Sequence, residues 1–148
     1  MITAKEIAAL REETGAGVME CKQALTEASG DVNKAKEILR ERGQLKASKR
    51  EGRATGAGKI EAYVHNNRVG VLVELRTETD FVARSEPFCE LAHNLALQLA
   101  AMPAETADEF LTQPFIRDES RTVSEILKDT IAKVGENITL GKFYRIEI

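Results

Sequence analysis

Hydrophobic residues over positions 1–43 recur every three or four residues, which is the spacing of amphipathic helices. Thr3 and Glu6 have the T-x-x-E spacing of a capping box, in which each side chain accepts a hydrogen bond from an otherwise free backbone N–H. Glycines then interrupt the pattern, and Asp31 is placed to cap a third helical segment that ends before Gly43. We therefore predict three short helices in this region.

After residue 58 the hydrophobic period changes from 3.6 to 2, which predicts strands. Residues 59–65 and 68–76 alternate in polarity and are separated by two asparagines, the pattern of a β-hairpin. Residues 87–102 return to helical spacing, and a further helix is predicted from Thr122 with Glu125 as its capping partner. Residues 138–146 alternate again and predict a closing strand.

The order strand, strand, helix, helix, strand predicts an α+β core with a small antiparallel sheet covered by helices. We assign residues 1–43 to a three-helix module, residues 44–58 to a linker and residues 59–148 to this core. The linker is polar, basic and glycine-containing and shows no apolar period, so we expect an extra helical turn that leads into a flexible end. Three helices of this size bury little apolar area, so we expect them to work as a tethered module.

Composition and charge favour an ordinary globular protein over a general nucleic-acid binder, a disulfide-rich or zinc protein, or a membrane protein. Of the 148 residues 43% are hydrophobic and 30% charged, and the formal net charge is −3, whereas a general nucleic-acid binder is usually basic. The two cysteines lie far apart without a C-x-x-C spacing, which indicates neither a disulfide framework nor a zinc site. The apolar segment 95–102 is too short to cross a bilayer, and the first residues carry acids where a signal peptide would be apolar. We expect a cytoplasmic protein without membrane or direct nucleic-acid partners.

No set of residues predicts catalysis. Neither His65 nor His93 can be placed beside a serine or cysteine nucleophile, and the glycine-rich stretches 14–17 and 52–59 lack the full phosphate-binding pattern. Four basic residues in and near the linker are typical of a solvated charged segment: Lys46, Lys49, Arg50 and Arg53. We predict that the protein is not an enzyme and holds neither a cofactor nor a metal.

The stretch RTETDFVARSEPF, residues 76–88, places Phe81 directly after Asp80 where a strand gives way to a helix. One interpretation is structural: Asp80 or Ser85 caps a helix, and Phe81 and Val82 pack under the sheet. The other is that the aromatic ring is presented to a binding partner. The pattern of residues alone favours the structural interpretation.

Four stretches resemble one family. LREETGAGVMECKQAL (10–25) and VELRTETDFVAR (73–84) resemble the two signatures of elongation factor Ts, the guanine-nucleotide exchange factor of elongation factor Tu. QPFIRD (113–118) and IAKVGENITLGKFYRIEI (131–148) are similar to later parts of the same family. The resemblance implies a ubiquitin-associated-like three-helix module followed by an α+β core of the dimerisation type.

The resemblance also implies roles for individual residues. In that family the T-D-F-V motif approaches the G domain of elongation factor Tu near its magnesium site, and the phenylalanine enters an apolar pocket. The matching residues here are Thr79, Asp80, Phe81 and Val82. The N-terminal module of the family docks beside the same domain, and the matching residues are Arg11, Val18 and Met19. The implied partner is elongation factor Tu in its GDP-bound and nucleotide-free forms.

The chain departs from the family pattern at Arg76, at residues 141–143, and between Met102 and Gln113, where a longer helical excursion is missing. The sequence therefore leaves the choice between monomer and homodimer open. Two other functions also stay open: a module that binds helical or ubiquitin-like partners without exchange activity, and an RNA-associated protein that uses Lys49, Arg50 and Arg53.

Overall fold

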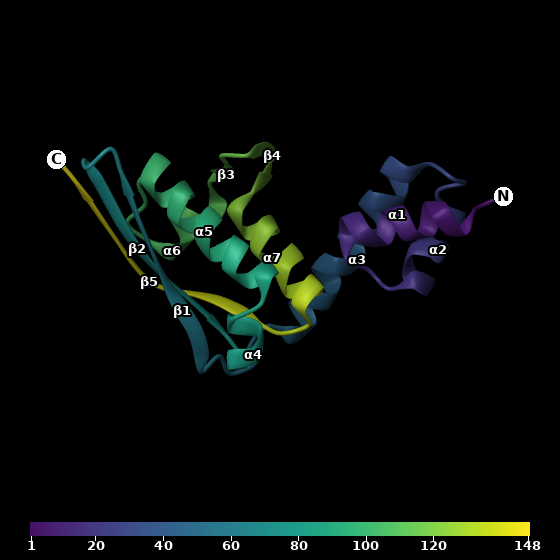
Figure 1. Ribbon diagram of the computed structural model, residues 1–148, viewed down its shortest axis with the longest axis horizontal. Helices are drawn as coiled ribbons and strands as arrows, with labels where there is room; N and C mark the ends of the chain where they lie inside the picture. Colours follow the sequence, from purple (N-terminus) through teal and green to yellow (C-terminus); the bar gives the residue numbers. More distant parts are fainter.

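The computed structural model describes residues 1–148 and forms two packed parts joined by one long helix (Figure 1). The N-terminal part contains α1 (Ala4–Thr14), α2 (Val18–Glu27) and the first half of α3 (Val32–Arg50). Its small core consists of seven buried residues: Leu10, Cys21, Ala24, Leu25, Ala28, Ala35 and Leu39. No helix of the fold combines the length and the hydropathy that a membrane span requires.

The predicted ends of the first helices are confirmed. The Glu6 N–H donates to Thr3 Oγ1 over 3.2 Å, and the Thr3 N–H donates to Glu6 Oε2 over 2.7 Å, which completes the capping box. Helix α1 ends at Gly15, whose φ of +71° lies in the left-handed region that favours glycine. Asp31 caps α3 by accepting the Lys34 N–H over 3.1 Å.

The predicted end of the third helix is wrong, because α3 continues through Gly43 to Arg50. Gly43 faces helix α7 (Val123–Val134), and Ala47, one turn further along, is buried in the core of the second part. Tertiary packing therefore outweighs the helix-ending preference of glycine. Residues 44–50, predicted as linker, are helical, while the division of the chain into domains stays a prediction.

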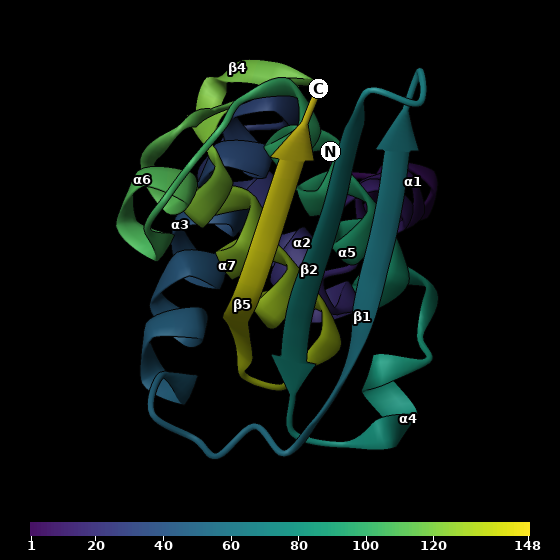
Figure 2. The same cartoon turned by 90° about the vertical axis from the view of Figure 1, so that its left-hand side faces the viewer.

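The second part contains the predicted α+β core. Strands β1 (Ala57–His65), β2 (Val69–Thr77) and β5 (Ile138–Glu147) form an antiparallel sheet in the order β1-β2-β5. Helices α5 (Glu86–Ala101) and α7 lie behind one face of this sheet and leave the other face uncovered (Figure 2). Four short elements were not predicted: α4 (Asp80–Ala83), α6 (Ala107–Thr112), β3 (Pro114–Phe115) and β4 (Asp118–Thr122).

The uncovered face carries much of the apolar side of β1. Ile60 is 67% exposed and Val64 is 63% exposed, whereas Tyr63 is half-buried against the core. Hydrophobicity alone would place the face of β1 that carries Ile60 and Val64 in the core, but the opposite face of the strand lies against the core. Strand β2 beside it supplies a row of three buried valines and one buried leucine, and β1 packs against α5.

A register shift in the middle of β5 changes which of its side chains face the core. Leu75 pairs with Leu140, whereas Val73 pairs with Phe143, so β5 has one extra residue between the two pairs. The side chain of Glu74 lies at this bulge, and its Oε1 accepts the Lys142 N–H over 3.1 Å. After this bulge Phe143 points inward and packs edge-on against Phe110, with ring centroids 5.1 Å apart. Tyr144 and Ile146 consequently face solvent.

Candidate functional site

The candidate site begins where β2 ends, at a turn formed by residues 79–82. Thr79 has extended backbone angles and caps α4 by accepting the Val82 N–H at its Oγ1 over 3.3 Å. The hydroxyl of Ser85 donates to the Val82 carbonyl over 2.6 Å and closes the other end. Thr79 is thus the cap of α4, whereas Asp80, which the structural interpretation gave as one possible cap, is the first residue of that helix. Ser85, the other possible cap, is the N-cap residue of α5.

Burial separates the residues of the 79–82 turn into two groups. Val82 is 7% exposed and contributes to the main hydrophobic core, so its side chain anchors the short helix to the protein. Phe81 is 81% exposed, although a phenylalanine side chain is one of the groups that burial stabilises most. Packing of Phe81 under the sheet is therefore excluded as its role in this structure. Asp80 is exposed beside it.

One residue that supports the turn, Glu136, was not predicted from the sequence. Glu136 lies 57 positions after Thr79, directly behind the end of α7, yet its carboxylate accepts the Thr79 N–H over 3.0 Å and the Thr79 hydroxyl over 2.8 Å. It also accepts the hydroxyl of the buried Thr77 over 3.1 Å. The only available signal was the family resemblance of residues 131–148, and spacing along the chain could not have indicated the contact.

The N-terminal candidate residues lie on the outer side of the three-helix module. A shallow hollow of about 450 Å³ between α1 and the start of α2 is lined by Ala4, Ile7, Ala8, Arg11, Glu12 and Val18. Arg11 and Val18 thus meet in one hollow. Met19 follows on α2 and is 64% exposed. These side chains form a small apolar surface edged by one positive and one negative charge.

The structure does not bring the two groups of candidate residues together. Helix α4 lies at one edge of the second part, and α1 and α2 lie at the far end of the N-terminal part (Figure 1). Helix α3 runs from the N-terminal part into the second part, where it packs against α7. Gln44 of α3 donates to Asp129 Oδ1 over 3.0 Å and to the Glu125 carbonyl over 3.4 Å, both on α7. The 79–82 turn and the N-terminal candidate residues therefore form two separate surfaces, on two parts of the protein that are joined through α3.

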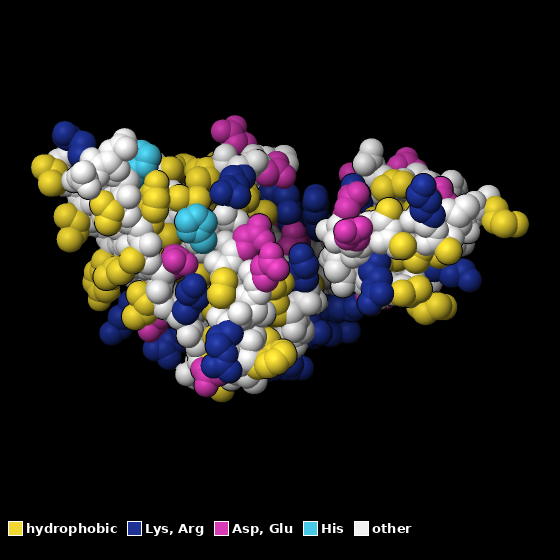
Figure 3. Space-filling view, in the orientation of Figure 1, with side chains coloured by type: hydrophobic (Ala, Val, Ile, Leu, Met, Phe, Trp, Pro, Cys, Tyr) yellow, Lys and Arg dark blue, Asp and Glu magenta, His cyan; other side chains and the backbone are white.

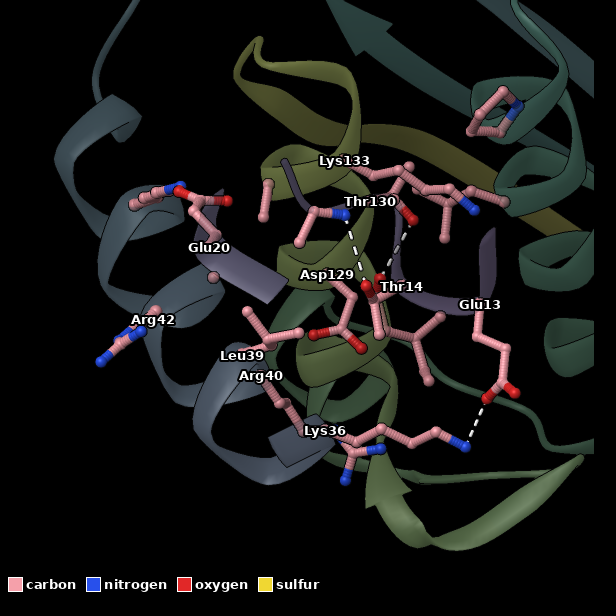
Figure 4. Close-up of a pocket in the computed structure, with 18 of the residues that line it drawn as sticks. Glu13, Thr14, Glu20, Lys36, Leu39, Arg40, Arg42, Asp129, Thr130 and Lys133 are labelled. Atoms are coloured by element: carbon pink, nitrogen blue, oxygen red, sulfur yellow. Dashed lines mark hydrogen bonds and ion pairs between the residues drawn. The ribbon is translucent and has the colours of Figure 1, made fainter. Parts of the chain in front are cut away.

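A cavity of about 480 Å³ lies between the two parts. Charged side chains of both signs line it, and Lys36 and Glu13 form an ion pair there (Figure 4). Two further ion pairs join Lys46 with Glu20 and Arg121 with Asp129. Burial, together with the nearby positive charge of Arg40, lowers the pKa of Arg121. The lining includes the two buried side-chain atoms that lack a hydrogen-bond partner: Asn94 Oδ1 and Arg121 Nε.

The remaining reactive side chains form no cluster of potential metal ligands. Tyr63 Oη lies 2.8 Å from His65 Nδ1 on the surface of β1, and His93 is exposed on α5. Cys21 is buried in the three-helix module, and Cys89 is half-buried on α5. None of these groups lies in the 79–82 turn.

Comparison with known proteins identifies relatives over nearly the whole chain. A family model described as elongation factor TS matches residues 78–148. A protein of Oleidesulfovibrio alaskensis named elongation factor Ts is 40% identical, with 99% of this chain and 98% of the relative covered. The protein of the same name from Moorella thermoacetica is 39% identical, with 100% and 96% covered.

The relatives differ from the chain in length. The alignments with the first two relatives extend over 193 and 194 residues, so both relatives contain residues that have no counterpart in the 148 residues here. That difference agrees with a missing excursion, whose position between Met102 and Gln113 stays a prediction. An elongation factor Ts of Clostridium botulinum is 44% identical over 149 residues, and the chain spans 48% of its length.

Proposed function

Because the chain belongs to the elongation factor Ts family, we propose that it is a guanine-nucleotide exchange factor that promotes GDP release from elongation factor Tu. The observation that carries the proposal is Phe81, an aromatic ring that is 81% exposed on a turn whose backbone is fixed by hydrogen bonds. An exposed ring on a rigid support is suited to enter an apolar pocket of a partner.

Thermodynamic linkage explains how such binding releases a nucleotide. A factor that binds the nucleotide-free partner more tightly than the GDP-bound partner must weaken GDP binding by the same free energy. Much of the affinity for GDP comes from phosphates held by a metal ion and backbone N–H groups, so a displaced loop at that site supplies the coupling. In this proposal Phe81 enters the pocket, Asp80 makes the neighbouring polar contact, and Thr79 and Val82 hold the turn.

The surface area of the Phe81 ring determines how much its burial can accelerate GDP release. A phenyl side chain buries about 150 to 250 Å², which at about 25 cal/mol per Å² is worth roughly 4 to 6 kcal/mol before the costs of ordering. After these costs a few kcal/mol remain, which corresponds to about two orders of magnitude in rate. A larger acceleration requires a second contact with the partner.

The N-terminal surface supplies that second contact. Arg11, Val18 and Met19 are exposed on the three-helix module and would bind the same partner beside its nucleotide site. Two linked contacts increase the effective concentration of each at its own site, so the module would increase affinity while the 79–82 turn displaces the nucleotide. The chain acts through binding alone in this proposal, without covalent catalysis or a cofactor of its own.

The uncovered sheet face supports self-association as a further part of the proposal. Exposed apolar side chains cover it: Ile60, Ala62 and Val64 of β1, Leu72 of β2, and Tyr144 and Ile146 of β5. Pairing aligns Ala62 with Leu72 and Leu72 with Tyr144, so these three side chains form one continuous row across the sheet. Hydrophobic atoms gather along the left of the molecule, where the sheet lies (Figure 3). An antiparallel sheet usually shows polar residues to solvent, and this face fits a second copy of the chain.

The experiment that tests the exchange function is release of a fluorescent GDP analogue from elongation factor Tu. With the chain present in substoichiometric amounts and unlabelled GDP in excess, we expect all of the labelled nucleotide to be released faster than its spontaneous rate. Tight association with a protein that is not a GTPase, together with no effect on GDP release, would instead favour the interaction module. Loss of RNA binding in a variant with Lys49, Arg50 and Arg53 neutralised would favour the RNA-associated protein.

A further inference from the structure

The 79–82 turn cannot fix its own position. Helix α4 has four residues and closes only about one turn, and helices of that length are unstable by themselves. Its hydrophobic anchors, Val82 and Ala83, both lie in the second half of the short helix and leave its beginning, before Phe81, without an apolar attachment. A second attachment at the beginning of the turn is therefore required.

Glu136 supplies this attachment with both of its carboxylate oxygens. Oε1 accepts the Thr79 N–H over 3.0 Å and the Thr77 hydroxyl over 3.1 Å, and Oε2 accepts the Thr79 hydroxyl over 2.8 Å. Hydrogen bonds to an ionised acceptor are stronger than those between neutral groups. Thr79 Oγ1 also accepts the Val82 N–H, so the bonds from Glu136 lead directly to the cap of α4.

Glu136 is itself held between two fixed elements. Before it, Gly135 ends α7 with a φ of +78°, and its N–H donates to the Ile131 carbonyl over 2.9 Å. After it, Asn137 is buried and donates from Nδ2 to the Arg53 carbonyl over 3.0 Å. The Asn137 carbonyl lies 3.0 Å from Thr77 Oγ1 and shares the single hydroxyl hydrogen of Thr77 with Glu136 Oε1. Because both neighbours of Glu136 are held in place, its carboxylate keeps the turn in a fixed position relative to the core.

We propose that Glu136 is a positioning residue for nucleotide exchange, which orients Phe81 toward the partner by holding Thr77 and Thr79. The inference rests on the proposed exchange function. Glu136 acts through the turn and does not touch the nucleotide, so it sets the maximal rate of GDP release in the complex and leaves the affinity of the complex nearly unchanged.

The test measures GDP release from elongation factor Tu by stopped flow over a range of concentrations of the full chain. The maximal rate and the half-saturating concentration are obtained for the wild type, Glu136→Ala and Glu136→Gln. We expect Glu136→Ala to lower the maximal rate about tenfold and to change the half-saturating concentration by less than about threefold. Glu136→Gln keeps one oxygen acceptor and should restore most of the rate. Glu86→Ala removes an exposed acid at the start of α5 and should match the wild type.

A double-mutant cycle separates positioning from a general loss of structure. If Glu136 acts through Phe81, adding Glu136→Ala to Phe81→Ala should change the maximal rate by less than about twofold. Hydrogen exchange of the amides in residues 79–82 should increase in Glu136→Ala, while that of β2 stays at the wild-type rate. The inference is overturned by equal rate losses in both backgrounds, by a change in affinity alone, or by faster exchange throughout the core.

The outcomes also separate this inference from the function on which it rests. A wild-type chain that does not accelerate GDP release would refute the exchange function itself. A wild type that is active and depends on Phe81, together with a Glu136→Ala variant of unchanged rate, would refute only the role of Glu136.

Discussion

Gly43 of α3 lies against Ala132 of α7: a Cβ built on Gly43 would approach the Cβ of Ala132 to 3.2 Å. The missing side chain lets the two helices approach closely and thereby joins the N-terminal part to the core. The same glycine, taken from the sequence, predicted a helix end.

Replacement of Gly43 by leucine should force α3 away from α7. Overpacking of this kind costs about 1 to 3 kcal/mol, which we expect as a lower free energy of unfolding in urea. Gly56→Leu is the control, because a Cβ at Gly56 meets nothing within 4 Å and its φ is not in the left-handed region. Equal stability of the two variants would contradict close packing at Gly43.

Acid should weaken the attachment of α2 to α3. A hydrogen bond from Lys46, followed by one from the Gly17 N–H, lowers the pKa of Glu20 below its ordinary value of 4.5. A carboxyl group with a lowered pKa in the folded state adds stability above its unfolded pKa, and this contribution disappears as the pH falls through the folded pKa. Glu20→Gln should therefore lower Tm by about 1 to 3 °C at pH 7.

At a pH below the lowered pKa of Glu20 the two proteins should have the same Tm, because Glu20 is then protonated in the folded state as well. Thermal unfolding followed by circular dichroism between pH 3 and pH 7 measures the difference. Glu37→Gln, which removes an exposed acid of α3, serves as the control. A Tm difference for Glu20→Gln that is independent of pH would show that the charge of Glu20 is not the cause.

Self-association through the sheet should depend on Leu72, which is central on the uncovered face. We expect the wild type to approach the mass of a dimer as its concentration rises in sedimentation equilibrium. Leu72→Glu should remain a monomer, because a buried charge without a partner is costly. Leu45→Glu changes an equally apolar exposed residue of α3 and should behave as the wild type. A monomeric wild type at every concentration would refute self-association.

Met19 should contribute mainly to affinity. Met19→Ala removes an exposed apolar side chain from the N-terminal surface, and the loss of a good interface contact weakens binding about tenfold. The maximal rate of GDP release should stay close to that of the wild type. Val32→Ala, an exposed aliphatic residue at the start of α3, is the control. Titration of labelled elongation factor Tu gives the affinity; a loss confined to the maximal rate would contradict this role.

Local signals in the sequence predicted the architecture well. The capping box of Thr3 and Glu6 is confirmed, and so is the α+β fold, because caps and hydrophobic periods depend on residues close in sequence. The family resemblance is confirmed by relatives about 40% identical over nearly the whole chain. The Phe81 motif stood out in the sequence, and its exposure became known only from the structure.

Contacts between distant segments could not be predicted. The orientation of Tyr144 depends on a bulge opposite Glu74, and the length of α3 depends on Ala132, which lies far from Gly43 in the chain. The contact of Glu136 with Thr79 likewise joins positions 57 apart. Each of these features is determined by tertiary packing, which overrides local preference.

The most direct test of the account is the maximal rate of GDP release from elongation factor Tu with saturating Phe81→Ala, compared with the wild type and with Ile116→Ala. Ile116 is the control because it is an exposed apolar residue outside both candidate surfaces. We expect Phe81→Ala to lower the maximal rate by about two orders of magnitude while it still binds elongation factor Tu, and Ile116→Ala to have no effect. A maximal rate for Phe81→Ala equal to that of the wild type would contradict the account.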